Sequence, residues 1–325
     1  MDNLKNKNVL FLDGLNNLYH DGLIKAFRNL DINVTQIVYT DFMYRSKIAK
    51  LRKNIFGINY KFDEKQFFKS INGQYDLVFI KNPESVSKDI FIKLKTKYPG
   101  IPFINYNWNS IHLLDYSSYI PLFDRVYSFD AYDAQKYNLS YYPLFYLPAF
   151  EKIAINDLKK EYSLSFVGST FTTGRPAFLS NFNKLIKERK ISSFQHLHAY
   201  PKLYYINKFF RSYNFNKLLT TKYLSQQAFL EICKRSLAFI DHPNEDQKGH
   251  TIRTFETLAA GLMLVTTNKE LLKEPFYDAS RIQIIKDDFS DLNLDALLNF
   301  QPSFPEGFEK YRVDNWLATI LEHHL

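Results

Sequence analysis

Short apolar runs alternate with stretches of helical period along the first half of the chain. The apolar runs predict strands at Asn8–Leu12, Asn33–Tyr39, Tyr75–Ile80, Pro102–Tyr106 and Arg125–Phe129. The helical patterns cover Leu15–Leu30, a broken stretch over Arg45–Ile71, Glu84–Tyr98 and a short one near Tyr116–Leu122. Asn82 and Pro83 suit the cap and first position of the helix over Glu84–Tyr98. Near-continuous apolar strands that alternate with helices are typical of a parallel sheet covered on both faces.

The second half of the chain restarts the same alternation. Between the halves, Tyr141–Ile155 is rich in Tyr, Pro and Phe and lacks a helical period, so we place a domain boundary near residue 152. Strands are then predicted at Leu164–Val167, Phe194–His198, Leu237–Asp241, Met263–Thr267 and Arg281–Ile285. Helices are predicted at Pro176–Arg189, from the cap Ser225 to Arg235, at Thr251–Ala260, Ser290–Asn299 and Glu306–Glu322. The pattern therefore predicts an α/β fold of two Rossmann-like domains that face a cleft.

Composition and charge narrow the function classes. Cys233 is the one cysteine of the 325 residues, which excludes a disulfide framework and a cysteine-based zinc site. The apolar runs fall far short of the ~20 residues needed to span a bilayer, and the first residues lack the apolar core of a signal peptide, so we expect a cytoplasmic protein. The net charge of +8 and the aromatic content of 17% fit an anionic partner: nucleotide phosphates, nucleic acid or an acidic membrane surface. An AT-rich genome would explain both numbers equally well.

Several common motifs are absent. The sequence contains neither G-x-G-x-x-G nor a P-loop, and neither G-x-S-x-G nor H-E-x-x-H. It has no Asp-x-Asp triplet, the metal site expected of a single-domain sugar transferase. His196 and His198 share one face of a predicted strand, but no third ligand is near, so strand packing is the favoured interpretation. We expect neither a metal nor a cofactor.

The stretch 236–268 carries the clearest chemistry: an apolar strand, a polar loop, and a helix whose predicted cap is Thr251. Arg253 lies in the first turn of this helix, and Glu256 follows three residues later on the same face. A loop rich in Gly and cations that leads into a helix N-terminus is suited to bind an anion. The alternative is a solvated helix start with an Arg–Glu surface pair. The polar residues of the strand end and the loop include Asp241, His242, Lys248, Gly249 and His250.

The same stretch carries a family pattern. Its elements are His242-Pro243, Gly249, Thr251, Arg253-Thr254, Glu256, Leu258, Gly261 and Thr266-Thr267-Asn268. This pattern resembles the donor-binding block of two-domain (GT-B) glycosyltransferases, and most of all the group-1 subset related to spore-maturation (CgeB-like) and surface-polysaccharide transferases. Weaker matches lie at Ser165–Ser169 with Arg175, at Tyr75–Lys81, Phe103–Ser110 and Phe123–Asp130, and at Pro143–Tyr146.

The resemblance implies roles for individual residues. Glu256 would bind the ribose of the nucleotide, while Lys248, Arg253 and Arg175 would bind its diphosphate and offset the leaving group's charge. Tyr200 would lie near the nucleobase of the donor. The full donor site would comprise Gly168, Ser169, Arg175, Tyr200, His242, Lys248, Gly249, His250, Thr251, Arg253 and Glu256. Lys248 stands where retaining relatives carry the first of two glutamates, so retention or inversion of stereochemistry is left open; Asn109 stands where relatives often have Asp.

The resemblance also implies a division of labour. An acceptor-binding domain would span 1–152, a nucleotide-sugar-binding domain 153–304, and a helix in 305–325 would cross back to pack on the first domain, with the two halves closing on the donor. Strand ends at the carboxyl edge of a parallel sheet are where sites lie, so Asp13, after the first predicted strand, is the first candidate base and His20 the second. An Asp at such a place is as often a cap or turn residue.

One more segment bears on partners. Residues 198–223 contain interleaved cations and aromatics and no acid. Such a segment can bind an anionic membrane face or stacked nucleotides, although a solvated helical pair with inward aromatics explains it as well.

We therefore expect a metal-independent glycosyltransferase that acts on a glycan or lipid-linked glycan acceptor in bacterial surface polysaccharide or lipopolysaccharide synthesis, peripheral on the inner membrane face and without a nucleic-acid partner. The alternatives are a non-catalytic nucleotide-sugar-binding protein and a basic nucleic-acid-binding protein.

Overall fold

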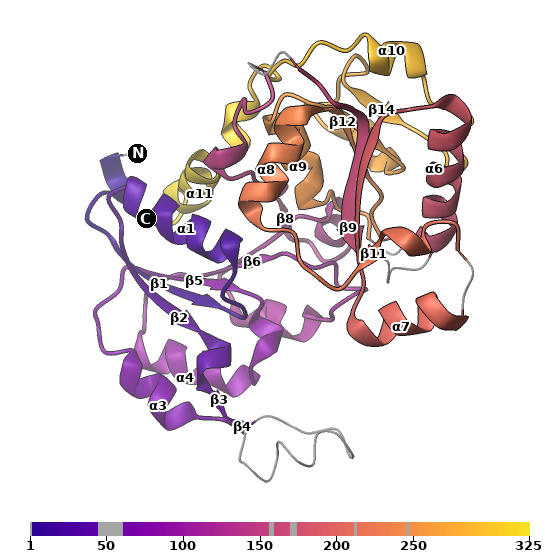
Figure 1. Cartoon of the computed structure of the whole chain (residues 1–325). Helices are drawn as coiled ribbons and strands as arrows, with labels where there is room; N and C mark the ends of the chain where they lie inside the picture. The colour runs from indigo at the N-terminus through magenta and orange to yellow at the C-terminus, as the bar shows by residue number, and fades with distance from the viewer. Residues whose placement is uncertain (1, 45–60, 156–158, 170–173, 211–212, 245–246) are drawn as a thin grey trace. The chain divides into compact units, whose positions relative to one another are not determined.

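The computed structural model describes residues 2–44, 61–155, 159–169, 174–210, 213–244 and 247–325. They divide into two compact units: Met1–Pro143 together with Val313–Leu325, and Leu144–Arg312 (Figure 1). Each unit contains a six-stranded parallel sheet with helices, which confirms the predicted fold class. Among the described residues, no helix is both long enough and apolar enough to cross a membrane.

The first unit is built on a sheet with the strand order β2-β1-β5-β6-β7-β8. Its strands are β1 (Asn8–Asp13), β2 (Asn33–Val38), β5 (Leu77–Lys81), β6 (Phe103–Asn107), β7 (Arg125–Ser128) and β8 (Ser140–Tyr141). Its helices are α1 (Leu18–Asn29), α3 (Glu64–Ser70), α4 (Lys88–Lys97), α5 (Ala131–Lys136) and α11 (Val313–Glu322). The 3-10 turns are η1 (Asp2–Leu4), η2 (Tyr39–Phe42), η3 (Pro83–Ser85) and η4 (Ser117–Leu122), and β3 (Met43–Tyr44) pairs antiparallel with β4 (Lys61–Phe62).

Both faces of this sheet are covered by packed side chains. Successive strand residues point to opposite sides, and apolar residues on each side meet helices. On one face Phe11 of β1 and Phe79 of β5 pack against Phe27 of α1, with ring centroids 5.6 Å apart between Phe11 and Phe27. On the other face Leu10 and Leu12 join a buried cluster that includes residues of α3 and α4. This double cover explains why the strands read as continuous apolar runs.

Helix α11 packs within the first unit, beside α1 (Figure 1). Trp316 is fully buried there and donates its indole N–H to the carbonyl oxygen of Pro143 at 2.7 Å. Its ring meets Tyr106 edge to face, with centroids 4.6 Å apart. The last helix of the chain therefore completes the face of the sheet that α1 begins.

The second unit has the strand order β11-β10-β9-β12-β13-β14. Its strands are β9 (Tyr162–Ser169), β10 (Ser193–His198), β11 (Leu219–Thr220), β12 (Ser236–Asp241), β13 (Met263–Thr266) and β14 (Ile282–Ile284). Its helices are α6 (Arg175–Arg189), α7 (Pro201–Phe210), α8 (Gln226–Arg235), α9 (Ile252–Ala259) and α10 (Leu294–Leu298), with 3-10 turns η5 (Pro148–Phe150), η6 (Asn216–Leu218), η7 (Lys269–Lys273) and η8 (Phe308–Tyr311).

Two predicted helix starts are wrong. Asn82 adopts a left-handed backbone conformation (φ 56°) and opens the 3-10 turn η3, whereas Ser87 caps α4 through its side chain. Likewise Ser290 does not begin a helix, because α10 starts only after the cap Asn293. In both places the sequence offers two candidate caps a few residues apart, and the later one is used.

The predicted helix over Glu306–Glu322 is split. Gly307 takes a positive φ of 68° before the turn η8, and Arg312 is extended (φ −65°, ψ 136°) before α11. Arg312 forms an isolated parallel bridge with Tyr146, and this pairing takes it out of the helix. Of the broken stretch predicted over Arg45–Ile71, residues 45–60 lie outside the described part, and the remainder contains β4 and α3.

Candidate functional site

Each sheet has one point at which the strand order reverses, and ligands of such folds bind outside the carboxyl ends of the strands there. In the first unit this point lies between β1 and β5; in the second it lies between β9 and β12. Asp13 ends β1 and Lys81 ends β5, while Ser169 ends β9 and Asp241 ends β12. The candidate site residues therefore fall at the expected place in each unit.

In the second unit Arg175 ties the two central strand ends together. Its guanidinium donates to the carbonyl oxygen of Ser169 at 3.0 Å and to that of His242. Burial lowers the pKa of Arg175, which the charge of Asp241 opposes. Arg175, which was expected to bind the diphosphate, thus uses most of its N–H donors to hold the two strand ends together. Its buried Nε has no hydrogen-bond partner among the described residues.

The start of α9 is fixed to the end of β12. Thr251 caps the helix by accepting the backbone N–H of Arg253, as predicted. The hydroxyls of Thr251 and Thr254 donate to the same carboxylate oxygen of Asp241, at 2.7 and 2.9 Å. The helix N-terminus is therefore held rigidly at the carboxyl edge of the sheet.

Arg253 and Glu256 form a pair on one face of α9. The guanidinium of Arg253 contacts the Glu256 carboxylate at 2.8 Å and lies 3.9 Å from the ring centroid of Phe229 on α8. Glu256 is almost fully buried. Part of the alternative interpretation, an Arg–Glu pair, is thus present, although it is buried rather than on the surface.

A polar cavity of about 350 Å³ opens at the ends of β12 and β13. It brings together His242 and Lys248, two of the residues singled out in the sequence. The other lining residues are Pro243, Asn244, Gln247, Thr267, Asn268, Lys269, Glu270 and Asp287. Arg253 and Glu256 are not among them.

His242 gives this cavity an unusual group. The side chain is 4% exposed, its Nε2 lies 3.5 Å from Asp287, and its Nδ1 is a buried atom without a hydrogen-bond partner. Burial and the charge of Arg175 lower the pKa of His242, and Asp287 offsets this only in part. The cavity is therefore lined by an imidazole that is harder to protonate than a free one and whose Nδ1 is buried without a hydrogen-bond partner.

His250 is buried at the base of the loop that follows β12. Its Nε2 lies 2.8 Å from a carboxylate oxygen of Glu274, and its Nδ1 lies 3.3 Å from the side-chain amide of Asn268. These contacts hold the buried ring in place. The place of His250 in the donor site stays a prediction, and its partner Glu274 was missed because it lies 24 residues further along the chain.

Aromatic rings gather at the carboxyl end of β10. His198 stacks on Tyr223 with centroids 4.0 Å apart and meets Tyr200 edge to face at 5.6 Å. Tyr200 and Tyr223 are 50% and 74% exposed, so flat surfaces are presented to solvent. Tyr200 was predicted to lie near the nucleobase. Tyr223 was not singled out, because the sequence around it gives no signal of its stacking on His198. In the segment 198–223, residues 211–212 lie outside the described part, and membrane binding stays a prediction.

The first unit holds a buried charge cluster. Asp13 Oδ2 accepts from Lys81 Nζ at 2.7 Å and lies 3.0 Å from His20 Nδ1, and all three side chains are at most 3% exposed. Burial opposes ionisation of Asp13, but hydrogen bonds from His20 and Lys81 and the charge of Lys81 outweigh it and lower its pKa. Burial lowers the pKa of Lys81, and Asp13 opposes this. Lys81, which also lies 4.5 Å from the ring centroid of Trp108, was missed because it ends an otherwise apolar strand.

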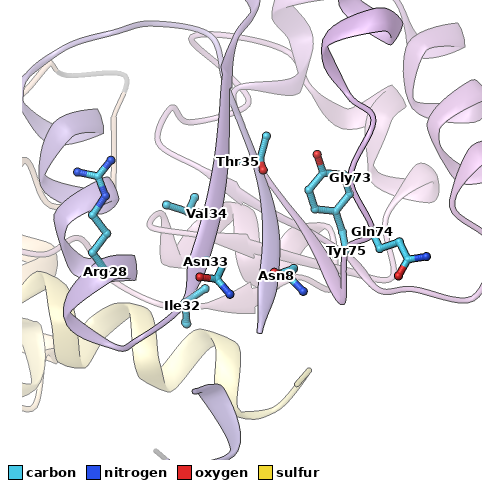
Figure 2. Close-up of a pocket in the computed structure, with 9 residues that line it drawn as sticks. All are labelled: Asn8, Arg28, Ile32, Asn33, Val34, Thr35, Gly73, Gln74 and Tyr75. Carbon is cyan, nitrogen blue, oxygen red and sulfur yellow. The ribbon is translucent and has the colours of Figure 1, made fainter. Parts of the chain in front are cut away.

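A second hollow, of about 630 Å³, lies at the opposite edge of the first sheet. Figure 2 shows Asn8 and Asn33 at the starts of β1 and β2, with Gln74 and Tyr75 from the segment before β5 and Arg28 from α1. Its polar side chains are exposed or half-buried. It lies away from the strand ends where chemistry is expected.

Within the described ranges, no group of three or more His, Cys, Asp or Glu side chains could hold a metal ion. His196, one half of the pair considered in the sequence, instead contacts the carbonyl oxygen of Lys222 at 3.0 Å.

No protein-family model matches the sequence, and no curated protein matches it. Solved structures, in contrast, are similar to this chain. An alpha-glucosyltransferase in complex with UDP and a 13-mer DNA with a central A:G mismatch matches over 96% of this chain and 95% of its own, at 14% identity and a TM-score of 0.61. A putative UDP-N-acetylglucosamine 2-epimerase from Listeria monocytogenes matches over 98% and 96%, at 11% identity and a TM-score of 0.56.

S. aureus MnaA in a structure with UDP matches over 97% of both chains, at 12% identity and a TM-score of 0.53. These likenesses show the fold, and the GT-B class predicted from the sequence is confirmed. They include epimerases as well as a transferase. Membership of the group-1, CgeB-like family stays a prediction.

Proposed function

We propose that the chain is a GT-B glycosyltransferase whose second unit binds a nucleotide-sugar. The observation that carries this proposal is the polar cavity at the ends of β12 and β13, which His242 and Lys248 both line. Its volume of about 350 Å³ lies in the range of small-molecule sites. In this proposal Lys248 supplies a cation for the phosphates, and the imidazole of His242 lines the same cavity.

The rings at the end of β10 support the same function. Tyr223 and Tyr200 present exposed faces beside His198, and aromatic faces stack well on a nucleobase. In this proposal Glu256 binds the ribose and Arg253 positions it through their contact. The acceptor, by the resemblance of the sequence, is a glycan or lipid-linked glycan of a bacterial surface polysaccharide or lipopolysaccharide.

The first test is ligand binding without a metal. We expect one nucleoside diphosphate and its sugar conjugate, from a panel of UDP, GDP, CDP and dTDP, to raise the melting temperature in the presence of EDTA. At 100 times its Kd such a ligand adds about 2.7 kcal/mol of apparent stability. No shift with any nucleotide would reject the donor site, and a shift that appears only with manganese would reject metal-independent binding. Tight, salt-sensitive RNA binding in place of nucleotide binding would favour the nucleic-acid alternative.

A second test addresses the cavity. Lys248→Met is expected to weaken binding of the nucleoside diphosphate roughly 10-fold or more, because hydrogen bonds to charged groups contribute ~1.5–3 kcal/mol. Isothermal titration calorimetry measures the dissociation constant. Lys184→Met on α6 is the matched control, since it removes the same charge from a site whose side chain is 69% exposed. Equal affinities for the two variants would remove Lys248 from the site.

Transfer and epimerisation need separate readouts, because the structural neighbours include epimerases. The transferase proposal predicts that nucleoside diphosphate accumulates as the sugar leaves. Conversion of the nucleotide-sugar into an epimer, with no nucleoside diphosphate lost from it, would replace transfer by epimerisation on the same site. Chromatography of the reaction mixture distinguishes the two.

A further inference from the structure

The polar hollow at the amino-terminal edge of the first sheet takes no part in the proposed donor site. Its volume is about 630 Å³, in the range of small-molecule sites. Figure 2 shows its 9 lining residues, which come from α1 and the turn after it, from the starts of β1 and β2, and from the segment before β5. All of them belong to the first unit, so the hollow is complete within one compact body.

Neutral hydrogen-bonding groups dominate the lining of this hollow. They are three side-chain amides and two hydroxyls, those of Asn8, Asn33, Gln74, Thr35 and Tyr75. All five side chains are exposed or half-buried, and within the part of the chain that the structure describes none of them forms a side-chain hydrogen bond. Amides and hydroxyls both donate and accept hydrogen bonds. The hollow therefore gathers donors and acceptors for a ligand that also carries both.

The charges around the hollow favour a neutral ligand. Arg28 is the one charged residue among the described residues of the lining, and it lies in the last turn of α1, at the negative end of the helix dipole. The carboxylate of Asp76 lies beside the lining, because it accepts the backbone N–H of Asn8 at 2.7 Å. A phosphate site usually gathers several cations or the N–H groups of a helix N-terminus, and the described lining has neither. Since Arg28 would also repel a cation, the lining suits a neutral compound rich in hydroxyl groups.

Tyr75 is held in a fixed position in this hollow. Its ring meets Tyr98 edge to face, with centroids 5.3 Å apart. An added Cβ on Gly73 would lie 3.0 Å from Cζ and from the hydroxyl oxygen of Tyr75, so the chain at Gly73 packs closely on the outer end of the ring. A ring held in this way is preorganised for a ligand, and it offers both an apolar body and a polar tip. Sugars combine C–H groups and hydroxyls in the same way, so this part of the hollow is suited to a sugar ring.

We propose that this hollow is a second ligand site of the chain and that it binds a neutral oligosaccharide. The amides and hydroxyls of the lining bond to sugar hydroxyls, Arg28 donates to a sugar oxygen, and Tyr75 contacts one sugar ring. The site shares no residue with the donor cavity. The inference goes beyond the proposed function, because binding here requires neither a nucleotide nor the transfer of a sugar.

A printed array of neutral and anionic oligosaccharides tests the class of ligand, with the full chain applied in the absence of any nucleotide. We expect the chain to bind at least one neutral glycan and to retain it in high salt, because salt screens charges and the ligand carries none. An NMR titration with that glycan then gives its dissociation constant. An array on which no glycan is bound, or on which anionic glycans alone are bound, would overturn the proposal.

Substitutions in the lining test the place of binding. Gln74→Ala removes an amide, Tyr75→Phe removes a hydroxyl and keeps the ring, and Arg28→Met removes the guanidinium. We expect each to raise the dissociation constant of the glycan about 2- to 10-fold, the effect of one lost hydrogen bond. Gln227→Ala on α8 and Lys25→Met on α1 are the matched controls and should bind like the wild type, since both side chains are exposed and outside the lining. Wild-type affinity in all three lining variants would place the glycan elsewhere on the chain and overturn the site.

Nucleotide binding separates this inference from the proposed function. Arg28→Met and Gln74→Ala should show the same shift in melting temperature with the nucleoside diphosphate as the wild type, and weaker glycan binding beside that unchanged shift supports the site. A chain that binds the nucleotide but no neutral glycan overturns the inference and leaves the donor site standing. A chain that loses glycan affinity in the lining variants, but binds no nucleotide, keeps this site and rejects the proposed function.

Discussion

Trp316→Ala is expected to lower the free energy of unfolding of the first unit by about 3–5 kcal/mol, the usual cost of truncating a fully buried large aromatic side chain. Trp316 is 0% exposed, its ring packs against Tyr106 and Tyr142, and its N–H is bonded to Pro143. The substitution removes both the packing and the hydrogen bond, and it leaves the carbonyl oxygen of Pro143 without this donor.

Urea unfolding measures this change. Both tryptophans of the chain, Trp108 and Trp316, belong to the first unit, so the fluorescence of Trp108 in the variant reports on that unit alone. Glu322→Gln on the exposed side of the same helix is the control and should lie within about 0.5 kcal/mol of the wild type. A change below 1 kcal/mol in Trp316→Ala would mean that α11 contributes little to the first unit.

Asp13→Asn is expected to destabilise the first unit by about 3–5 kcal/mol, because it leaves the buried ammonium of Lys81 without its carboxylate. The double variant Asp13→Asn with Lys81→Met should recover part of the loss, since no uncompensated charge then stays buried. Lys93→Met breaks an ion pair whose side chains are 53% and 43% exposed, and it should cost at most about 1 kcal/mol. A double variant as unstable as the sum of the two single variants would show that Asp13 and Lys81 do not interact.

The effect of Asp13 also depends on pH. Its pKa is lower in the folded state than in the unfolded state, so its ionisation stabilises the fold above the unfolded value of about 3.9. This stabilisation is lost as the pH falls through the folded pKa. The difference in stability between the wild type and Asp13→Asn should therefore be full at pH 6 and shrink below pH 4. A constant difference across this range would contradict the assignment.

Local signals in the sequence predicted most of the elements. Ser225 and Thr251 cap their helices as expected, because a cap needs only a side chain two or three residues from its partner. The strand pattern was recognisable because both faces of each sheet are covered. Asn82 is not the cap of α4: it takes a left-handed conformation before the turn η3 and lies close to Gly14, a residue far away in the sequence.

The candidate site could be predicted from the sequence only in part, because contacts between residues far apart in the sequence leave no local signal. His242 and Lys248 lie in one contiguous stretch, so the family pattern found them, and they share a cavity. Lys81 meets Asp13 only through the parallel register of β1 with β5. The contact of Arg175 with the carbonyl oxygen of His242 was not predicted, because it depends on how two strand ends meet, which a sequence pattern does not contain. The role of Arg175 as a phosphate ligand stays a prediction.

The position of α11 has a consequence for biosynthesis. The ribosome makes the sheet of the first unit early, but the helix α11, which packs beside α1, emerges only after all of Leu144–Arg312. At about 5–20 residues per second the delay is roughly 10–30 s. During that time Tyr106 and Tyr142 lack the ring of Trp316 that packs on them in the finished protein. A chain that ends before Val313 would contain every residue of the second unit but would lack the helix that packs beside α1 in the first unit.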